Sequence, residues 1–216
     1  PDTEVHPGAL AALVAFMDRY PKAGIVGVKL INPDGSFQAG PNRFPTLITV
    51  ELESWNIIQR FTRNPFYPSY PPEHSEVVLK CDWVGGACLL ARRAAINQVG
   101  LLDENFFMNS EEVDWCYRMQ QHGWEVWYTP EVAVVHLGGA SAKRTTPMQR
   151  LRNYRGKVLF LSKHHGAIAG TLARLHFQMS SFFKAIAYQL VYSFTRIQRF
   201  HEYAISHWII VQTKDW

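Results

Sequence analysis

The chain of 216 residues has no Asp or Glu between residues 132 and 201, although that segment holds 11 Lys and Arg. Residues 1–131 have the opposite balance, with 16 Asp and Glu against 10 Lys and Arg. The formal net charge of +4 therefore hides an acidic first part and a basic second part. Such a split predicts two functional surfaces, one of which meets an anionic partner.

The chain also lacks the features of several protein classes. Its cysteines are odd in number and lack CxxC spacing, which predicts free thiols in a reducing compartment rather than a disulfide framework or a zinc site. The best candidate for a membrane span, 186–194, is too short and contains Gln189 and Ser193. No charged-then-apolar leader is visible at Pro1, so we expect no secretory signal. The three cysteines are Cys81, Cys88 and Cys116.

The hydrophobic pattern predicts an α/β fold whose last part is helical. A turn of hairpin type is expected at Asn32–Ser36, and 62–76, with four prolines, is expected to be an irregular loop. Buried strands are predicted at 25–31, 125–128 and 132–135, and another one after Gly85 and Gly86. Helices are predicted at 9–20, 47–61, 92–99, 111–122, 145–164 and 167–199.

The most acidic stretch of the chain places Glu111, Glu112 and Asp114 within four residues. Asn109 or Ser110 can cap a helix that begins there, so the three acids fall in its first turn. One explanation is structural, because acids in a first turn complement the helix dipole by ~0.3–1 kcal/mol each. The other explanation is that the cluster does chemistry.

Several short motifs occur together in this sequence, and their combination is more specific than any one of them. They are Pro1-Asp2-Thr3, Asp34-Gly35, Gly85-Gly86-Ala87, Gly100-x-x-Asp103-Glu104-x-Phe106-Phe107, Glu111-Glu112-x-Asp114, and Val134-Val135-His136 with Gly138-Gly139. In order and spacing they resemble the C-terminal half of inverting family-2 glycosyltransferases of the GT-A fold. The likeness is greatest to bacterial rhamnosyltransferase-like members.

This resemblance implies a partial GT-A (Rossmann-like) domain that lacks its N-terminal nucleotide-binding half. Residues 1–142 would form the metal, donor and acceptor side of the catalytic domain. Residues 143–216 would form a basic extension of long amphipathic helices.

The resemblance also implies a divalent cation, Mg²⁺ or Mn²⁺, that offsets charge on the leaving diphosphate of a nucleotide-sugar donor. Asp2 matches the acidic metal signature of the family, and His136 matches a candidate second ligand through a neutral ring nitrogen. The structural alternatives are a mobile acid near the chain end and a hydrogen-bonded histidine at the end of a strand.

Inversion requires a base that takes the proton from the attacking acceptor hydroxyl. By resemblance this base is Glu112, although many members of the family have Asp at that position. Glu111 and Asp114 are the alternatives; they can instead orient the acceptor or cap the helix.

Further residues are expected to contact the substrates. Gly85 and Gly86 allow close backbone approach to a sugar, the alternative being a bulge at the start of a strand. Asp82 and Trp83 precede them and are expected to contact hydroxyls and ring faces of donor or acceptor. On the basic tail, the expected anion contacts are Arg152 and Arg155, unless they form a solvated basic face.

Apolar residues recur at three- and four-residue steps from Ile168 to Ile197, with cations but no acid among them. This stripe fits the surface of an anionic membrane near a lipid-linked acceptor. It fits equally a contact with the catalytic domain or with a partner subunit in a homodimer. Nucleic acid is not expected as a partner, because the basic residues accompany an apolar stripe rather than aromatic stacking positions.

The leading hypothesis is a hexosyltransferase that transfers rhamnose from dTDP-rhamnose, with inversion, to a glycan or lipid-linked acceptor in cell-surface polysaccharide synthesis. It would be cytoplasmic, at the inner face of the plasma membrane. The rival hypothesis is an inactive fragment that serves as a binding or membrane-associating module, because the nucleotide-binding half of the fold is missing from the chain.

Overall fold

The structure, a computed structural model, describes residues 2–55, 70, 72–137 and 147–214. The chain forms two compact units. Unit 1 comprises Pro1–Phe44, Tyr67–Asn105 and Glu111–Lys143, and unit 2 comprises Pro45–Phe66, Phe106–Ser110 and Arg144–Trp216. Our expected division was 1–142 and 143–216, whereas in the structure the segments 45–66 and 106–110 also belong to the helical unit.

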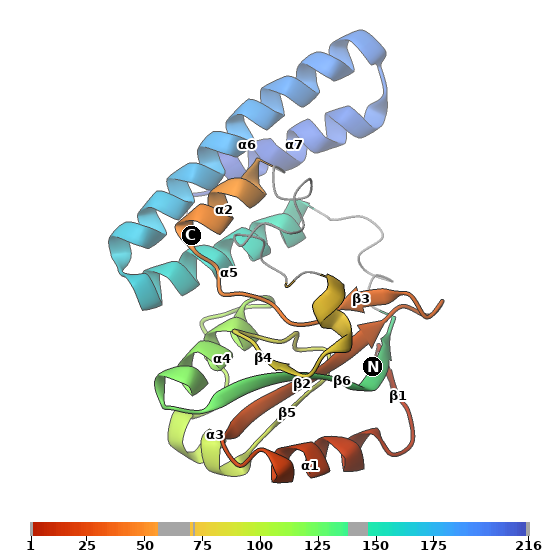
Figure 1. Cartoon of the computed structure of the whole chain (residues 1–216). Helices are drawn as coiled ribbons and strands as arrows, with labels where there is room; N and C mark the ends of the chain where they lie inside the picture. The colour runs from red at the N-terminus through yellow and green to blue at the C-terminus, as the bar shows by residue number, and fades with distance from the viewer. Residues whose placement is uncertain (1, 56–69, 71, 138–146, 215–216) are drawn as a thin grey trace. The chain divides into compact units, whose positions relative to one another are not determined.

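Unit 1 is built on a mixed sheet whose centre is a parallel pair of long strands, β2 (Ala23–Ile31) and β6 (Glu125–His136). Each long strand carries two short antiparallel partners on its outer side. These are β1 (Thr3–Val5) and β4 (Leu79–Lys80) on β6, and β3 (Phe37–Ala39) and β5 (Leu89–Ala91) on β2. Figure 1 shows the two long strands side by side across the unit.

The prediction of two separate strands at 125–128 and 132–135 is wrong, because both segments lie in the single strand β6. Thr129 pairs with Val28 and Ala133 pairs with Lys29, so the residues between form a bulge within one continuous strand. Pro130 lies in this bulge, and proline cannot donate to a ladder of hydrogen bonds. The interruption in the hydrophobic pattern therefore marks an irregularity, not the end of the strand.

Alternate residues of β2 face two different layers of the core. Val26, Val28 and Leu30 pack with the buried face of α1 (Ala9–Arg19). Ile25 packs on the other side with residues of α3 (Arg93–Val99) and α4 (Glu111–Gln121). The sheet is thus covered on both faces, as a nearly continuous apolar strand predicts.

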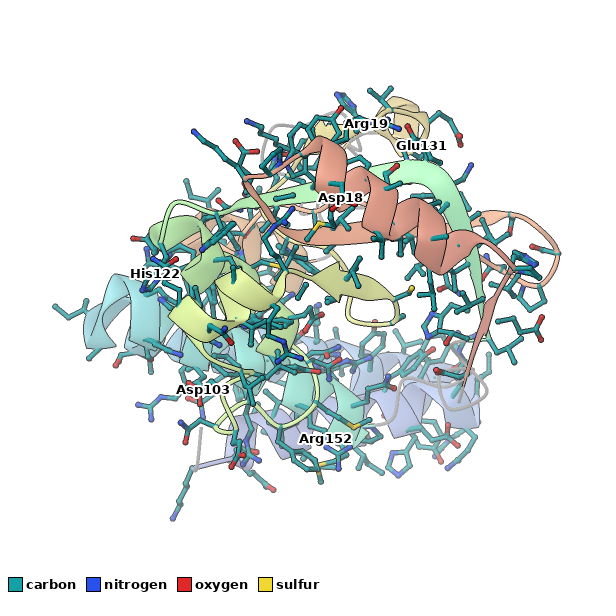
Figure 2. The ribbon with its side chains drawn as sticks, turned by 90° about the horizontal axis from the view of Figure 1, so that it is seen from below. Asp18, Arg19, Asp103, His122, Glu131 and Arg152 are labelled. Carbon is teal, nitrogen blue, oxygen red and sulfur yellow. The ribbon has the colours of Figure 1, made fainter. Side chains whose placement is uncertain are left out.

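At the rim of this arrangement, Arg19 at the end of α1 lies 3.6 Å from Glu131 of β6. Figure 2 shows the two side chains together on the surface. An exposed pair of this kind contributes little to stability.

A close approach fixes the segment before β5 against the sheet. A Cβ added at Gly27 would lie 2.4 Å from the Cβ of Val84, so only glycine fits at this position of β2. Val84 is buried and directly precedes Gly85 and Gly86. The glycine in the strand therefore helps to position the glycine pair predicted to meet substrate. The remaining short element of unit 1 is the 3₁₀ turn η2 (Pro72–Glu76).

Unit 2 consists of the helices α2 (Leu47–Ser54), α5 (Pro147–His165), α6 (Ala167–Thr195) and α7 (Gln198–Gln212). The sequence predicted the first three, although the end of the predicted 47–61 helix falls outside the described residues. It missed α7, because no glycine or proline marks the end of α6. The break is made by Arg196, which takes a left-handed conformation with φ of 56°. None of the helices in the described ranges is long and apolar enough to cross a membrane.

His207 of α7 is a buried histidine among cations. Arg150 of α5 donates from Nη1 to His207 Nε2 over 3.1 Å, and Tyr188 of α6 stacks on the imidazole with ring centroids 5.8 Å apart. Burial, together with the charges of Arg150 and Lys184, lowers the pKa of His207 to about 3 from 6.5. The ring is therefore neutral in the folded protein at neutral pH.

This burial predicts a pH-dependent stability. Between pH 6.5 and about 3 the unfolded chain takes up a proton at His207 that the folded chain does not, so acid destabilises the fold. The contribution is complete above pH 6.5 and is lost by up to ~1.4 kcal/mol per pH unit below it. Urea unfolding across this range should give a shallower slope for His207→Gln, and the parent slope for the exposed His6→Gln. Equal slopes in both variants would contradict the assignment.

Candidate functional site

The structure brings Asp2 and His136 together at one edge of unit 1. β1 runs antiparallel to the end of β6, with Thr3 opposite His136, and the Leu137 N–H donates to the Asp2 carbonyl over 2.7 Å. This register leaves Asp2 Oδ2 at 3.3 Å from His136 Nε2. The carboxylate is 60% exposed and the imidazole 23%, so the pair is accessible to a ligand.

Gln38 fixes the tautomer of His136, and sequence reasoning missed it. Its Nε2 donates to Asn32 Oδ1 over 2.8 Å and to the His136 carbonyl over 2.9 Å. The amide oxygen of Gln38 therefore faces His136 Nδ1, 2.6 Å away, and accepts its proton. The turn at Asn32–Ser36 makes this possible, because it returns the chain as β3 along β2. No motif of the sequence pointed to Gln38.

The pair suits a divalent cation. With Nδ1 protonated, His136 presents the lone pair of Nε2 toward the Asp2 carboxylate, and such a pair is stabilised by a cation between them. Adjacent ligands of an octahedral Mg²⁺ at ~2.1 Å lie about 3.0 Å apart, close to the observed 3.3 Å. The described residues contain no cluster of three or more His, Cys, Asp or Glu suited to a metal.

Glu112 lies against Gly86. A Cβ added at Gly86 would meet the Cβ of Glu112 at 3.7 Å and its Cγ at 3.9 Å. The glycine pair was expected to lead directly into a strand, but β5 begins only at Leu89, and the pair lies in the irregular segment before it. Glu112 thus lies in the first turn of α4, beside the backbone of Gly86, which has no side chain.

The Asp2–His136 pair and the glycine segment beside Glu112 belong to the same edge of the sheet. Because β5 is antiparallel to β2 with Leu89 opposite Gly27, the chain before Leu89 extends toward the carboxyl end of β2. Gly85 lies there, since its Cβ would be 3.8 Å from Leu30 Cδ1. Leu30 pairs with Val134, two residues before His136. Ligands of open α/β sheets bind outside the carboxyl ends of strands, where these residues gather.

Glu111 is half-buried, and its Oε2 is enclosed without a hydrogen-bond partner among the described residues. An enclosed carboxylate oxygen without a donor is costly, which favours a role toward a bound ligand. The backbone before it is also strained, because Met108, Asn109 and Ser110 all have left-handed φ, at 53°, 85° and 76°. Consecutive residues of this kind are held by their surroundings and occur often at functional sites.

Unit 2 supplies those surroundings through α5. A Cβ at Gly156 would lie 2.6 Å from Ser110 Oγ and 2.7 Å from the Asn109 carbonyl oxygen, so α5 packs closely on this segment. Arg152, one turn earlier, has its guanidinium 5.1 Å from the centre of the Phe107 ring. Arg152 therefore supports the chain that leads into α4. The side chain of Arg155 is half-buried on the same helix.

Asp82 and Trp83 hold the segment that follows β3. Asp82 Oδ2 accepts from the Phe44 N–H over 2.8 Å, and Trp83 Nε1 donates to the Arg43 carbonyl over 2.8 Å. Both side chains are half-buried. Their expected contact with substrate remains a prediction, and the structure adds a local role for each.

Comparisons with known proteins identify the family of the chain. Residues 1–212 match Glycosyl transferase family group 2. The chain belongs to this family. It is similar to the N-acetylglucosaminyl-diphospho-decaprenol L-rhamnosyltransferase of Mycobacterium tuberculosis, with 33% identity over 167 residues, 76% of this chain and 54% of the relative.

The names of two further relatives assign them to glycan synthesis. The O-antigen biosynthesis protein RfbC of Myxococcus xanthus is 29% identical over 140 residues, 64% of this chain and 10% of that protein. The low-salt glycan biosynthesis hexosyltransferase Agl10 of Haloferax volcanii is 31% identical over 55 residues, 26% of this chain and 18% of that protein. The chain thus spans about half the length of the mycobacterial relative and less of the others.

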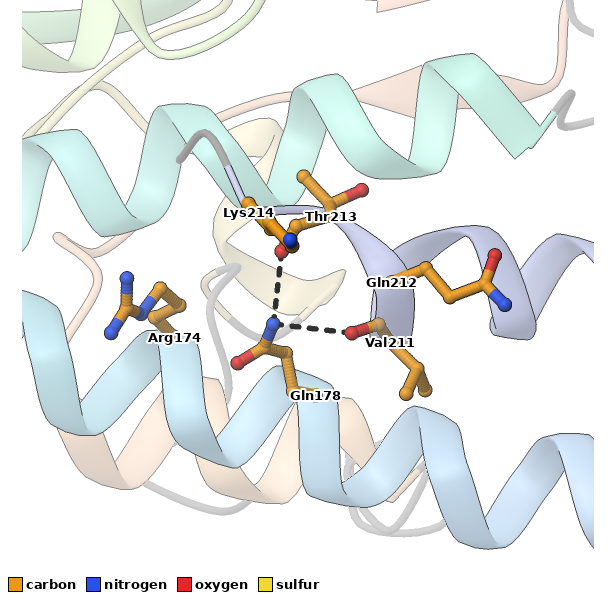
Figure 3. Close-up of a pocket in the computed structure, with 6 residues that line it drawn as sticks. All are labelled: Arg174, Gln178, Val211, Gln212, Thr213 and Lys214. Atoms are coloured by element: carbon orange, nitrogen blue, oxygen red, sulfur yellow. Dashed lines mark hydrogen bonds between the residues drawn. The ribbon is translucent and has the colours of Figure 1, made fainter.

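Two further features of the described residues bear on the choice of a base or nucleophile. A cavity of about 510 Å³ in unit 2 is lined by Arg174, Gln178, Val211, Gln212, Thr213 and Lys214, and Gln178 Nε2 donates there to the Thr213 carbonyl over 3.0 Å (Figure 3). None of these six described lining residues carries a carboxylate that could act as a base. Burial raises the pKa of the Cys116 thiol to about 12, and the pKa values of the other two cysteines are also raised, which makes the thiols poor nucleophiles.

Asp114 has a structural role within α4. It is fully buried, and its Oδ2 accepts from Arg118 Nε over 2.7 Å. Arg118 also donates to the Val99 and Leu101 carbonyls, over 2.9 and 2.8 Å. The carboxylate therefore holds the guanidinium that joins α4 to the end of α3. Of the three acids, Asp114 has the clearest structural role.

Asp114→Asn should lower the free energy of unfolding by ~3 kcal/mol, because it leaves the Arg118 cation without its buried counter-charge. The exposed Asp18→Asn on α1 (Figure 2) is the matched control and should change stability by less than ~0.5 kcal/mol. Urea unfolding measures both. If Asp114→Asn were as stable as the parent while its transfer activity fell, the side chain would act on substrate instead.

Proposed function

We propose that this glycosyltransferase transfers rhamnose from dTDP-rhamnose to a glycan or lipid-linked acceptor, with inversion, in cell-surface polysaccharide synthesis. The observation that carries the proposal is the edge of unit 1 where Asp2 and His136 lie together and Glu112 lies beside Gly86. The similarity to a mycobacterial rhamnosyltransferase supports the choice of sugar, and the name of that relative supports a diphospholipid acceptor. Such an acceptor would place the reaction at the inner face of the plasma membrane.

In the proposed reaction, the acceptor hydroxyl oxygen attacks the anomeric carbon from the face opposite the diphosphate. Glu112 takes the hydroxyl proton as the new carbon–oxygen bond forms. The bond to the diphosphate breaks, and its electron pair leaves with the diphosphate oxygen. One displacement of this kind inverts the anomeric centre.

Asp2 and His136 would hold the divalent cation that offsets charge on the leaving diphosphate. Gln38 keeps His136 in the tautomer whose Nε2 can bind metal. Gly85 and Gly86 leave room for the sugar beside Glu112. Arg152 and Arg155 remain the proposed anion contacts.

The base assignment predicts a loss of turnover rather than of binding. Glu112→Gln keeps the size of the side chain but cannot accept the proton, so kcat should fall by roughly 10²–10⁴-fold with little change in KM for the donor. Transfer from dTDP-rhamnose to a diphosphoprenyl-linked acceptor measures both constants. Glu131→Gln, on an exposed acid of β6, is the matched control and should retain parent activity.

Parent-like turnover by Glu112→Gln would end the base assignment without affecting the family. A parent protein that binds dTDP-rhamnose and never turns it over would instead favour the rival function, a binding module.

A further inference from the structure

The helix α6 is built with its large apolar side chains outward. Seven of them are at least half exposed; Phe183 lies against Trp55, and the other six recur along one side of the helix. The residues that α6 buries are mostly small, such as Ala173, Ser181 and Ala185. We call the six the α6 stripe: Ile168, Leu172, Leu175, Met179, Leu190 and Phe194.

The other sides of α6 are already occupied within unit 2. Tyr154 of α5 stacks on Phe177 with centroids 3.9 Å apart, and Trp208 of α7 meets Phe182 at 5.7 Å. On another side, Ser54 of α2 lies 2.5 Å from the ring of His176. The stripe is the side that these three helices leave uncovered. Its six side chains extend over 27 residues, a length of ~40 Å in an α-helix.

An exposed apolar surface of this length on a protein marks an interaction site. The charge around it decides between partners. Residues 132–201 contain 11 Lys and Arg and no Asp or Glu. Exposed cations stand at both ends of the stripe, Lys163 before it and Arg196 and Arg199 after it.

A second copy of the chain is a poor match for this charge. In a two-fold dimer the same patch meets itself, so the cations at the stripe ends would approach one another with no acid from 132–201 to pair with them. A surface of anionic lipid headgroups supplies the missing negative charge and accepts the apolar side chains at its acyl boundary.

We propose that unit 2 binds an anionic lipid membrane through the α6 stripe, with α6 lying in the plane of the interface. The apolar side chains enter the headgroup boundary, and the flanking cations contact lipid phosphates. This inference depends on unit 2 alone, so it stands or falls independently of the sugar donor and of Glu112.

The test is co-flotation of the purified protein with lipid vesicles. The parent should bind vesicles of phosphatidylcholine mixed equally with phosphatidylglycerol, bind phosphatidylcholine alone much less, and release as salt is raised. Leu172→Glu with Met179→Glu, both 50% exposed, should weaken binding by roughly tenfold or more, because two apolar contacts become charges.

The matched control adds the same two charges to α1. Leu10→Glu with Val14→Glu, at 63% and 51% exposed, changes an apolar helix surface of unit 1 and should bind vesicles like the parent to within about twofold. Circular dichroism confirms that both double variants keep their helices.

Three outcomes would overturn the proposal. The parent could fail to bind anionic vesicles, or the two double variants could bind equally, which would leave net charge as the only determinant. Sedimentation could also show a dimer that only the stripe variant dissociates, with no vesicle binding by the parent. That last result would assign the stripe to a second copy of the chain.

Discussion

The parallel pairing of β2 with β6 is the constraint on which the candidate site depends. Because the two strands end at the same edge, everything attached to their carboxyl ends is gathered there. β1 brings Asp2 to His136, β3 brings Gln38 to the same imidazole, and Gly27 holds the chain that leads to the glycine pair. A slip of β6 by one residue against β2 would turn His136 to the other face of the sheet, away from Gln38.

The second constraint is the entry into α4. Three consecutive left-handed residues precede Glu111, and such a backbone persists only where its surroundings determine it. Gly156 and Arg152 of α5 pack on this segment. Within unit 2, the basic helices therefore have two roles: α5 packs on residues 107–110, and α6 presents the α6 stripe. The charge split of the sequence agrees with this division.

Much of this followed from the sequence, for identifiable reasons. Glu111, Glu112 and Asp114 head a helix as expected, because dense acids after Asn-Ser are a strong local signal. The family resemblance, which the comparison confirms, led to the prediction that Asp2 and His136 bind the same cation, although they are distant along the chain. The apolar period of α6 was visible, but only the structure shows which side of it stays exposed.

What the sequence did not predict depended on contacts between distant residues. Gln38 carries no motif, and its role comes from the register of a three-residue strand. Gly156 matters because Ser110 lies against it. The predicted break between 125–128 and 132–135 is a bulge, since pairing on both sides carries β6 through Pro130. The structural use of Asp114 depends on the carbonyls that its partner Arg118 reaches.

The most direct test of the account is to locate the metal. Crystals of the protein grown with Mn²⁺ and dTDP should give an anomalous peak within coordination distance of Asp2 Oδ2 and His136 Nε2, and His136→Ala should abolish it. The same experiment with Gln38→Ala should weaken the peak, because the imidazole loses its fixed tautomer. A manganese peak bound elsewhere in unit 1, or one that survives in His136→Ala at the same position, would contradict the claim that this edge of the sheet is the catalytic site.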